Sequence, residues 1–140
     1  IGNNLTHGII YDFIKKISYN KKILNVLGDG NQQKPYSDVL EIIECMIYIK
    51  NKKFLKNINY FNIGSNEKGI KVREIVDIFL NETNYGTKPI FQKKKQGWEG
   101  DVLNYSYSTK KINKLGFKFK LSSKQVITKT IKNSVKINIK

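Results

Sequence analysis

The chain has 140 residues and a mass of 16.2 kDa, enough for one domain with a hydrophobic core. Its 39% hydrophobic and 26% charged residues are typical of a globular protein. The longest apolar stretch, 39–49, contains Glu41 and Glu44 and is far shorter than the roughly 20 residues of a membrane-spanning helix, which excludes that class. No secretory signal pattern begins at Ile1, and Cys45 is the single cysteine, so we expect a reducing, cytoplasmic setting without disulfides.

The formal net charge of +15 suggests a nucleic acid or another polyanion as a partner. However, Arg73 is the only arginine among the 26 basic residues, whereas base and phosphate recognition favour the arginine fork. The lysine runs at 93–95 and 110–111 lack interleaved aromatic residues and any helix-turn-helix pattern. We therefore expect the lysines to form a solvated surface, and we keep a free-standing basic module that binds nucleic acid as the alternative function.

The first half of the chain alternates between helical and strand-like patterns. Helical spacing of apolar residues predicts a helix over 7–20, and a short apolar run predicts a strand over 23–27 that ends in a glycine turn. Asp38 and Glu41 have the spacing of a capping box, which predicts the start of a helix that ends near residue 50. Asn59–Ile63 is expected to be a second strand. The inner face of the capped helix is expected to consist of Val39, Ile42, Ile43, Met46 and Ile47.

The second half continues the alternation. We expect a helix over 72–83, a strand over 88–91, a short helix over 110–115 and a final helix capped by a serine at 122–123. The segment 92–104 has no periodicity and is expected to be a long ordered loop, where functional residues often lie. Helices that alternate with short apolar strands favour an α/β fold class.

Residue patterns alone identify no catalytic group, cofactor loop or metal site. The glycine turn at 28–30 has a superficial likeness to a dinucleotide fingerprint, but position 33 is Gln33 where that motif needs glycine, so we expect a plain turn. His7 is the only histidine, which leaves little basis for a metal cluster or a serine, histidine and acid triad. A Tyr-x-x-x-Lys spacing can place a phenol beside an ammonium, but its occurrences lack any distinguishing context. They are Tyr11 with Lys15, Tyr48 with Lys52 and Tyr107 with Lys111.

Short motifs in a fixed order along the chain carry a family resemblance. They are HGIIYDFI at 7–14, LNVLGDGNQQKPY at 24–36, YFNIGS at 60–65, GWEGDV at 97–102 and KLGF at 114–117. Together they resemble the C-terminal half of the extended short-chain dehydrogenase family, the NAD-dependent nucleotide-sugar epimerases and dehydratases, with most likeness to the UDP-glucose 4-epimerase type. The resemblance covers nearly the whole chain.

The resemblance implies that residues 1–140 form the C-terminal substrate lobe of an extended Rossmann-type enzyme whose N-terminal cofactor-binding half is absent. NAD would be bound mainly by that absent half, which would also carry the catalytic tyrosine and lysine. The helix over 38–50 and the strand over 59–63 would return to the cofactor domain and complete its sheet. Without that domain, one strand edge and one apolar helix face are expected to be uncovered, and such surfaces favour association.

The resemblance also implies which residues bind the nucleotide sugar. The backbone at Gly8 and Ile9 would contact the nucleotide, the strand over 25–27 would form a wall for the base, and Lys34 would lie near the nucleotide. Trp98 stands where the family usually has an arginine. The complete set is Gly8, Ile9, Asn25, Val26, Leu27, Lys34, Tyr36 and Trp98.

The expected function is therefore the UDP- or dTDP-sugar-binding part of an epimerase or dehydratase that is inactive without its N-terminal half. A degenerate remnant without a ligand is a further alternative. Non-specific binding to a phosphate backbone would weaken steeply with salt, whereas a nucleotide-sugar pocket would depend on salt less and would prefer one nucleobase. The resemblance leaves open the sugar, the choice between epimerisation and dehydration, and whether a homodimer forms.

Overall fold

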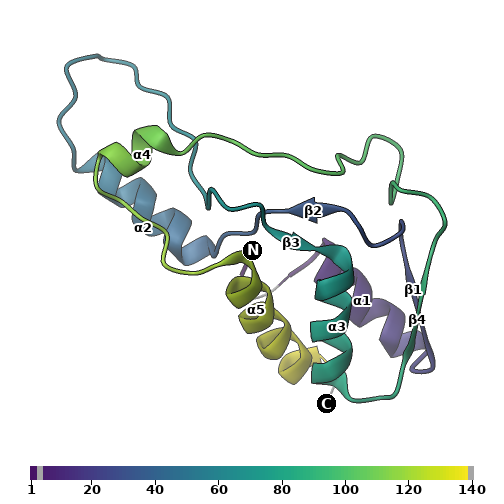
Figure 1. Cartoon of the computed structure of the whole chain (residues 1–140). Coiled ribbons are helices and arrows are strands. Elements are labelled where there is room, and N and C mark those ends of the chain that lie inside the picture. Colours follow the sequence, from purple (N-terminus) through teal and green to yellow (C-terminus); the bar gives the residue numbers. More distant parts are fainter. Residues whose placement is uncertain (3–4, 139–140) are drawn as a thin grey trace.

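The computed structural model describes residues 1–2 and 5–138, which form helices and two small sheets (Figure 1). In chain order, the elements are α1 (Ile9–Tyr19), β1 (Ile23–Val26), β2 (Gln33–Lys34), α2 (Val39–Lys50), β3 (Ile70–Lys71), α3 (Val72–Thr83), β4 (Lys88–Phe91), α4 (Lys110–Lys114) and α5 (Ser123–Asn138). The α/β fold class predicted from the alternating pattern is confirmed. None of the helices in the described part of the chain has the length and apolarity that crossing a bilayer requires.

The two sheets place the segments that matter for the site. β1 and β4 pair in parallel, with Ile23 opposite Lys88 and Val26 opposite Phe91. β2 and β3 pair antiparallel, with Lys34 opposite Ile70. The strands at 23–27 and 88–91 were predicted from sequence, whereas β2 and β3 are too short for a periodicity to indicate them.

The hydrophobic core lies among α1, α3, α5 and the β1–β4 sheet. The apolar stripe that predicts α1 is the face that α1 buries, and Phe13 on α1 meets Phe79 on α3 with ring centroids 5.5 Å apart. α5 begins as predicted at a serine, because Ser122 Oγ accepts a hydrogen bond of 3.3 Å from the amide of Gln125. These contacts fix one end of the molecule around the β1–β4 sheet.

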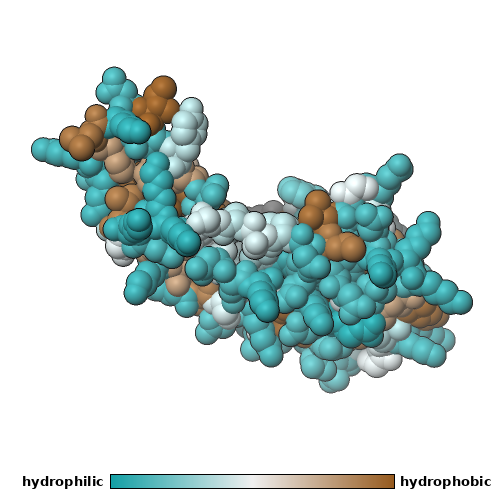
Figure 2. All heavy atoms as spheres, turned by 45° about the horizontal axis from the view of Figure 1, so that its top comes forward, coloured by the Kyte–Doolittle hydropathy of each residue, from teal (hydrophilic) through white to brown (hydrophobic). Residues whose placement is uncertain are grey.

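α2 and α4 form an arm that extends to one side of this core together with the loop 51–63 (Figures 1 and 2). Tyr48 on α2 donates a hydrogen bond to the carbonyl of Leu115, and its ring lies 5.5 Å from that of Phe117. Cys45 is buried on this same side of α2. The arm is thus held by the segment that follows α4.

The predicted inner face of α2 is wrong for this chain. Ile42 is half-buried, but the other apolar residues of that face are exposed, including Met46 at 56% and Ile47 at 54%. The side that is covered carries Glu41, Cys45 and Tyr48, because that side meets the segment after α4. The exposed apolar face is named here the α2 face: Val39, Leu40, Ile43, Met46 and Ile47.

Two local predictions in the same region are also corrected. Asn59–Ile63 is not a strand, because a strand requires a hydrogen-bonded neighbour and no described strand lies beside it. The capping box is only half formed. Asp38 accepts a hydrogen bond of 2.9 Å from the amide of Leu40, but Glu41 instead accepts one of 2.8 Å from the amide of Lys120. Glu41 therefore ties the arm to the chain that leads into α5.

Candidate functional site

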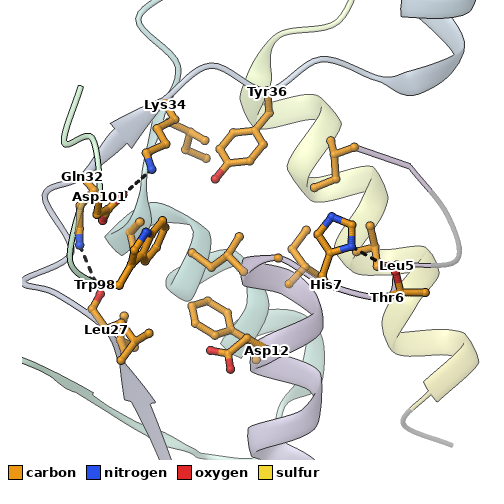
Figure 3. Close-up of a pocket in the computed structure, with 18 residues that line it drawn as sticks. Leu5, Thr6, His7, Asp12, Leu27, Gln32, Lys34, Tyr36, Trp98 and Asp101 are labelled. Atoms are coloured by element: carbon orange, nitrogen blue, oxygen red, sulfur yellow. Dashed lines mark hydrogen bonds and ion pairs between the residues drawn. The ribbon is translucent and has the colours of Figure 1, made fainter. Parts of the chain in front are cut away.

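A cavity of about 690 Å³ lies where the start of α1, the end of β1, the β2–β3 pair and the loop after β4 meet (Figure 3). The structure brings most of the predicted binding residues to its wall: Gly8, Ile9, Val26, Leu27, Lys34, Tyr36 and Trp98. Asn25 does not line it. The backbone carbonyl of Asn25 accepts a hydrogen bond of 3.0 Å from Lys16 Nζ, which ties β1 to α1. These wall residues are far apart in the sequence and are brought together only by the fold.

The glycine turn after β1 shapes one side of the cavity. Gly28 has a φ of +78°, and a Cβ added there would lie 1.8 Å from the side-chain nitrogen Nε2 of Gln32. The backbone angle therefore favours glycine, and the side-chain amide of Gln32 packs over the position that a Cβ would take. The turn closes through a hydrogen bond of 2.9 Å from the amide of Asn31 to Asp29 Oδ1, and it leads into β2. It is a plain turn, as predicted.

Lys34 is positioned in the cavity by the β2–β3 pair. A Cβ added at Gly69 would lie 2.0 Å from the carbonyl oxygen of Lys34, so the close approach of the two backbones depends on glycine. Lys34 Nζ lies 2.6 Å from Asp101 Oδ1, and the two side chains are 23% and 2% exposed. The other carboxylate oxygen of Asp101 accepts a hydrogen bond of 3.1 Å from the amide of Gly97. The ammonium of Lys34 is thus paired with a buried carboxylate.

Tyr36 is a half-buried phenol at the wall of the site. Its amide donates a 2.8 Å hydrogen bond to Ser123 Oγ, which fixes it against the start of α5. Burial, reinforced by neighbouring Tyr105 and Asp101, raises the pKa of Tyr36 to about 12. The phenol therefore stays neutral at physiological pH, where it can donate a hydrogen bond to a ligand but cannot act as a phenolate base.

The wall of the cavity is not basic, although the chain carries a net charge of +15. Lys34 is the single lysine or arginine among the described lining residues, which also include the carboxylates of Asp12 and Asp101. Asp12 is paired with Lys16 at 2.6 Å. Within the described residues, no group of three His, Cys, Asp or Glu side chains could hold a metal ion. The site is therefore suited to a mainly apolar or aromatic ligand surface with a few polar contacts.

Sequence reasoning missed several lining residues. Gln32, Asp101, His7 and Asp12 all line the cavity but were not assigned to it. Asp101 could have been found, since it follows Trp98 in the motif GWEGDV. No sequence motif points to Gln32, because it reaches the cavity wall only through the packing of its side chain over Gly28.

The described residues do not fit a dinucleotide cofactor. A dinucleotide-binding turn leads into a helix whose first amides face the phosphates. Here the turn at 28–30 leads into β2 instead, and α2 begins only at Val39. Any NAD-dependent step would therefore need residues beyond those described.

Solved structures of nucleotide-sugar enzymes share this fold. A UDP-galactose 4-epimerase structure is 27% identical with a TM-score of 0.74, over 95% of this chain and 42% of its own. A UDP-glucose 4-epimerase from Thermotoga maritima, solved with UDP-glucose, is 19% identical with a TM-score of 0.73, over 98% and 42% of the two chains. A UDP-glucuronic acid 4-epimerase from Bacillus cereus, solved with UDP-glucuronic acid and NAD, is 18% identical with a TM-score of 0.68, over 91% and 40%.

The resemblance to nucleotide-sugar epimerases is confirmed. The chain spans about 40% of the length of the solved epimerase chains that it matches. No protein-family model matches the sequence, and no curated protein matches it significantly. The likeness to the epimerases is thus carried mainly by the fold and by the short motifs.

Proposed function

We propose that this chain is the nucleotide-sugar-binding portion of an NAD-dependent epimerase or dehydratase. The observation that carries the proposal is the convergence of the predicted binding residues on one cavity of about 690 Å³. The epimerase fold supports it, since the solved relatives named above include complexes with UDP-glucose and UDP-glucuronic acid. The ligand is a UDP- or dTDP-sugar.

The residues of this chain bind and orient the ligand. Val26 at the end of β1 and Leu27 directly after it offer an apolar wall for a pyrimidine base. Lys34 donates one N–H of its ammonium to Asp101, which leaves two N–H donors for a diphosphate oxygen. Tyr36 offers a neutral O–H donor, because its pKa is raised to about 12. Their common task is to hold the sugar nucleotide in one orientation.

The chemistry lies with the cofactor domain that these residues would join. NAD would be held by the residues of that domain and would supply the hydride chemistry there. The α2 face and the segment 59–63 are the surfaces where that domain would dock, because the described residues leave the α2 face exposed and no described strand pairs with 59–63. This chain by itself would bind the ligand without turning it over.

Calorimetric titration with UDP-glucose, UDP-galactose and dTDP-glucose tests the proposal. We expect saturable binding that prefers one nucleobase, and a loss of affinity of about tenfold in Lys34→Ala, the size of a charge-assisted hydrogen bond. Since Lys34→Ala leaves Asp101 unpaired, Lys34→Gln serves as a second variant that can still donate to the carboxylate. Lys124→Ala removes an exposed lysine of α5 as the matched control.

Three results would contradict the proposal. They are the absence of heat with every nucleotide sugar on folded protein, equal affinities for wild type and both Lys34 variants, and turnover by this chain alone. Binding to an unrelated oligonucleotide that weakens steeply with salt would favour the basic-module alternative instead. Nothing at the cavity favours that alternative, since its lining contains a single lysine among the described residues.

A further inference from the structure

Trp98 is an exposed aromatic side chain at the wall of the cavity. It is the only tryptophan of the chain, and 59% of its surface is open to solvent. Figure 3 shows its indole inside the cavity, between Lys34 and Leu27. A tryptophan that anchors a loop buries its ring, so this degree of exposure is unusual for a purely structural role.

The loop around Trp98 is fixed on both sides. The amide of Asp101 donates a 3.1 Å hydrogen bond to the carbonyl of Trp98, and the Asp101 carboxylate in turn accepts one from the amide of Gly97. The same carboxylate holds Lys34, whose Nζ lies 4.9 Å from the centre of the indole. Trp98 is therefore presented to the cavity by a turn that is already ordered, so little entropy would be lost when a ligand contacts it.

The cavity wall offers a ligand phosphate little opportunity to form an ion pair. Asp101 neutralises Lys34, and the described lining contains no second lysine or arginine. A ligand phosphate would meet a cation that already has a carboxylate at 2.6 Å. The open surface of the indole offers a different attraction, because planar aromatic rings stack on tryptophan independently of charge.

We propose that Trp98 is the platform on which the nucleobase of the ligand stacks, and that this stacking contributes more to affinity than ion pairing with Lys34 does. The inference rests on the proposed function and names the contact that selects the ligand. The Trp98 turn lies against the end of β1, since a Cβ added at Gly97 would be 3.4 Å from the Cβ of Leu27. A base held against the β1 wall is therefore within reach of the indole, and a base is the flat, neutral, aromatic part of a nucleotide sugar.

Fluorescence of the single tryptophan tests this contact directly. We expect uridine and UDP-glucose to quench it saturably, and glucose 1-phosphate, which lacks the base, to leave it unchanged. In calorimetry with UDP-glucose, Trp98→Ala should lose about ten- to a hundredfold in affinity, the range of one base stacked on an aromatic ring. Trp98→Phe should keep most of the affinity, and Tyr19→Ala, which removes an exposed aromatic outside the cavity, should have no effect. Circular dichroism establishes that each variant is folded.

The failures can be told apart. If wild type binds UDP-glucose and Trp98→Ala binds it equally well, or Lys34→Gln loses more affinity than Trp98→Ala, the stacking inference is wrong and the proposed function stands. If glucose 1-phosphate quenches the fluorescence and uridine does not, the indole contacts the sugar and the base assignment is overturned. If folded wild type gives no heat with any nucleotide sugar, the proposed function fails and the inference fails with it.

Discussion

Lys34 and Asp101 are 67 residues apart in the sequence, and their side chains meet at 2.6 Å in the wall of the cavity. The pair joins the β2 strand to the loop after β4, and so links the two segments that carry the lysine and the tryptophan of the site. Its carboxylate is almost fully buried, while the ammonium keeps some contact with solvent.

Replacing Asp101 by asparagine should destabilise the fold. The change leaves Lys34 without its counter-charge, and we expect a loss of about 2 kcal/mol, below the ~3–5 kcal/mol of a fully buried pair because Lys34 is partly solvated. Asp12→Asn breaks the more exposed pair with Lys16 and should cost at most about 0.5 kcal/mol. Urea unfolding measures the free energy of unfolding of both variants. Equal losses in the two would contradict the idea that burial of the Asp101 carboxylate makes its ion pair more important for stability.

Asp38 should make the fold sensitive to acid. Burial raises its pKa, but the hydrogen bonds from Lys129 and from the amide of Leu40 outweigh this, so the pKa lies below the ordinary value of 3.8. A carboxylate with a depressed pKa contributes stability that is present above the unfolded-state value and is lost as the pH falls through the folded-state value.

We therefore expect Asp38→Asn, which can still cap α2, to be about 1 kcal/mol less stable than wild type at pH 7. This difference should shrink once the pH falls below 3.8. Thermal unfolding across a pH series measures it. Asp77→Asn alters an exposed carboxylate of α3 and is the control. A difference in stability between Asp38→Asn and wild type that stays constant from neutral to strongly acidic pH would contradict the role given to the Asp38 carboxylate.

Tyr36 should ionise late and weaken the fold at high pH. Burial raises its pKa to about 12 from the ordinary 10.0, so the neutral phenol contributes stability that is present below pH 10 and is lost as the pH rises toward 12. Ultraviolet absorbance of the phenolates should show a late transition that Tyr36→Phe removes. Tyr19→Phe, at an exposed position outside the cavity, should keep that transition. Its persistence in Tyr36→Phe would assign it to another tyrosine.

The α2 face should cause self-association of this chain. Its exposed apolar side chains form a contiguous helix surface, and removing such a surface from water is favourable. We expect Leu40→Glu with Met46→Lys to shift sedimentation toward the monomer without lowering the unfolding temperature, since both positions are exposed. Tyr19→Lys removes an exposed aromatic on α1 as the control. A wild-type chain that stays monomeric at high concentration would refute this prediction.

The helices could be predicted because each carries its own signal. The apolar stripe of α1 and the serine that caps α5 act locally, so the sequence pattern and the structure agree. The strand expected at 59–63 has a similar apolar pattern but does not form, because pairing needs a neighbour that no local pattern supplies. The apolar stripe of α2 predicted which face of the helix would pack inward. The described residues leave most of that face exposed and bury the side with Glu41 and Cys45 instead.

The sequence by itself determined the α/β class, most helix positions and the segments from which the site is built, because capping and apolar periodicity act over a few residues and each motif is a short local stretch. Only the tertiary structure decided that Lys34 is ion-paired with Asp101, that Tyr36 is half-buried near that carboxylate, and that Trp98 lies exposed at the cavity wall. The electrostatic and stacking character of a site depends on which distant side chains become neighbours. That outcome follows from packing of the whole chain, and no window of sequence contains it.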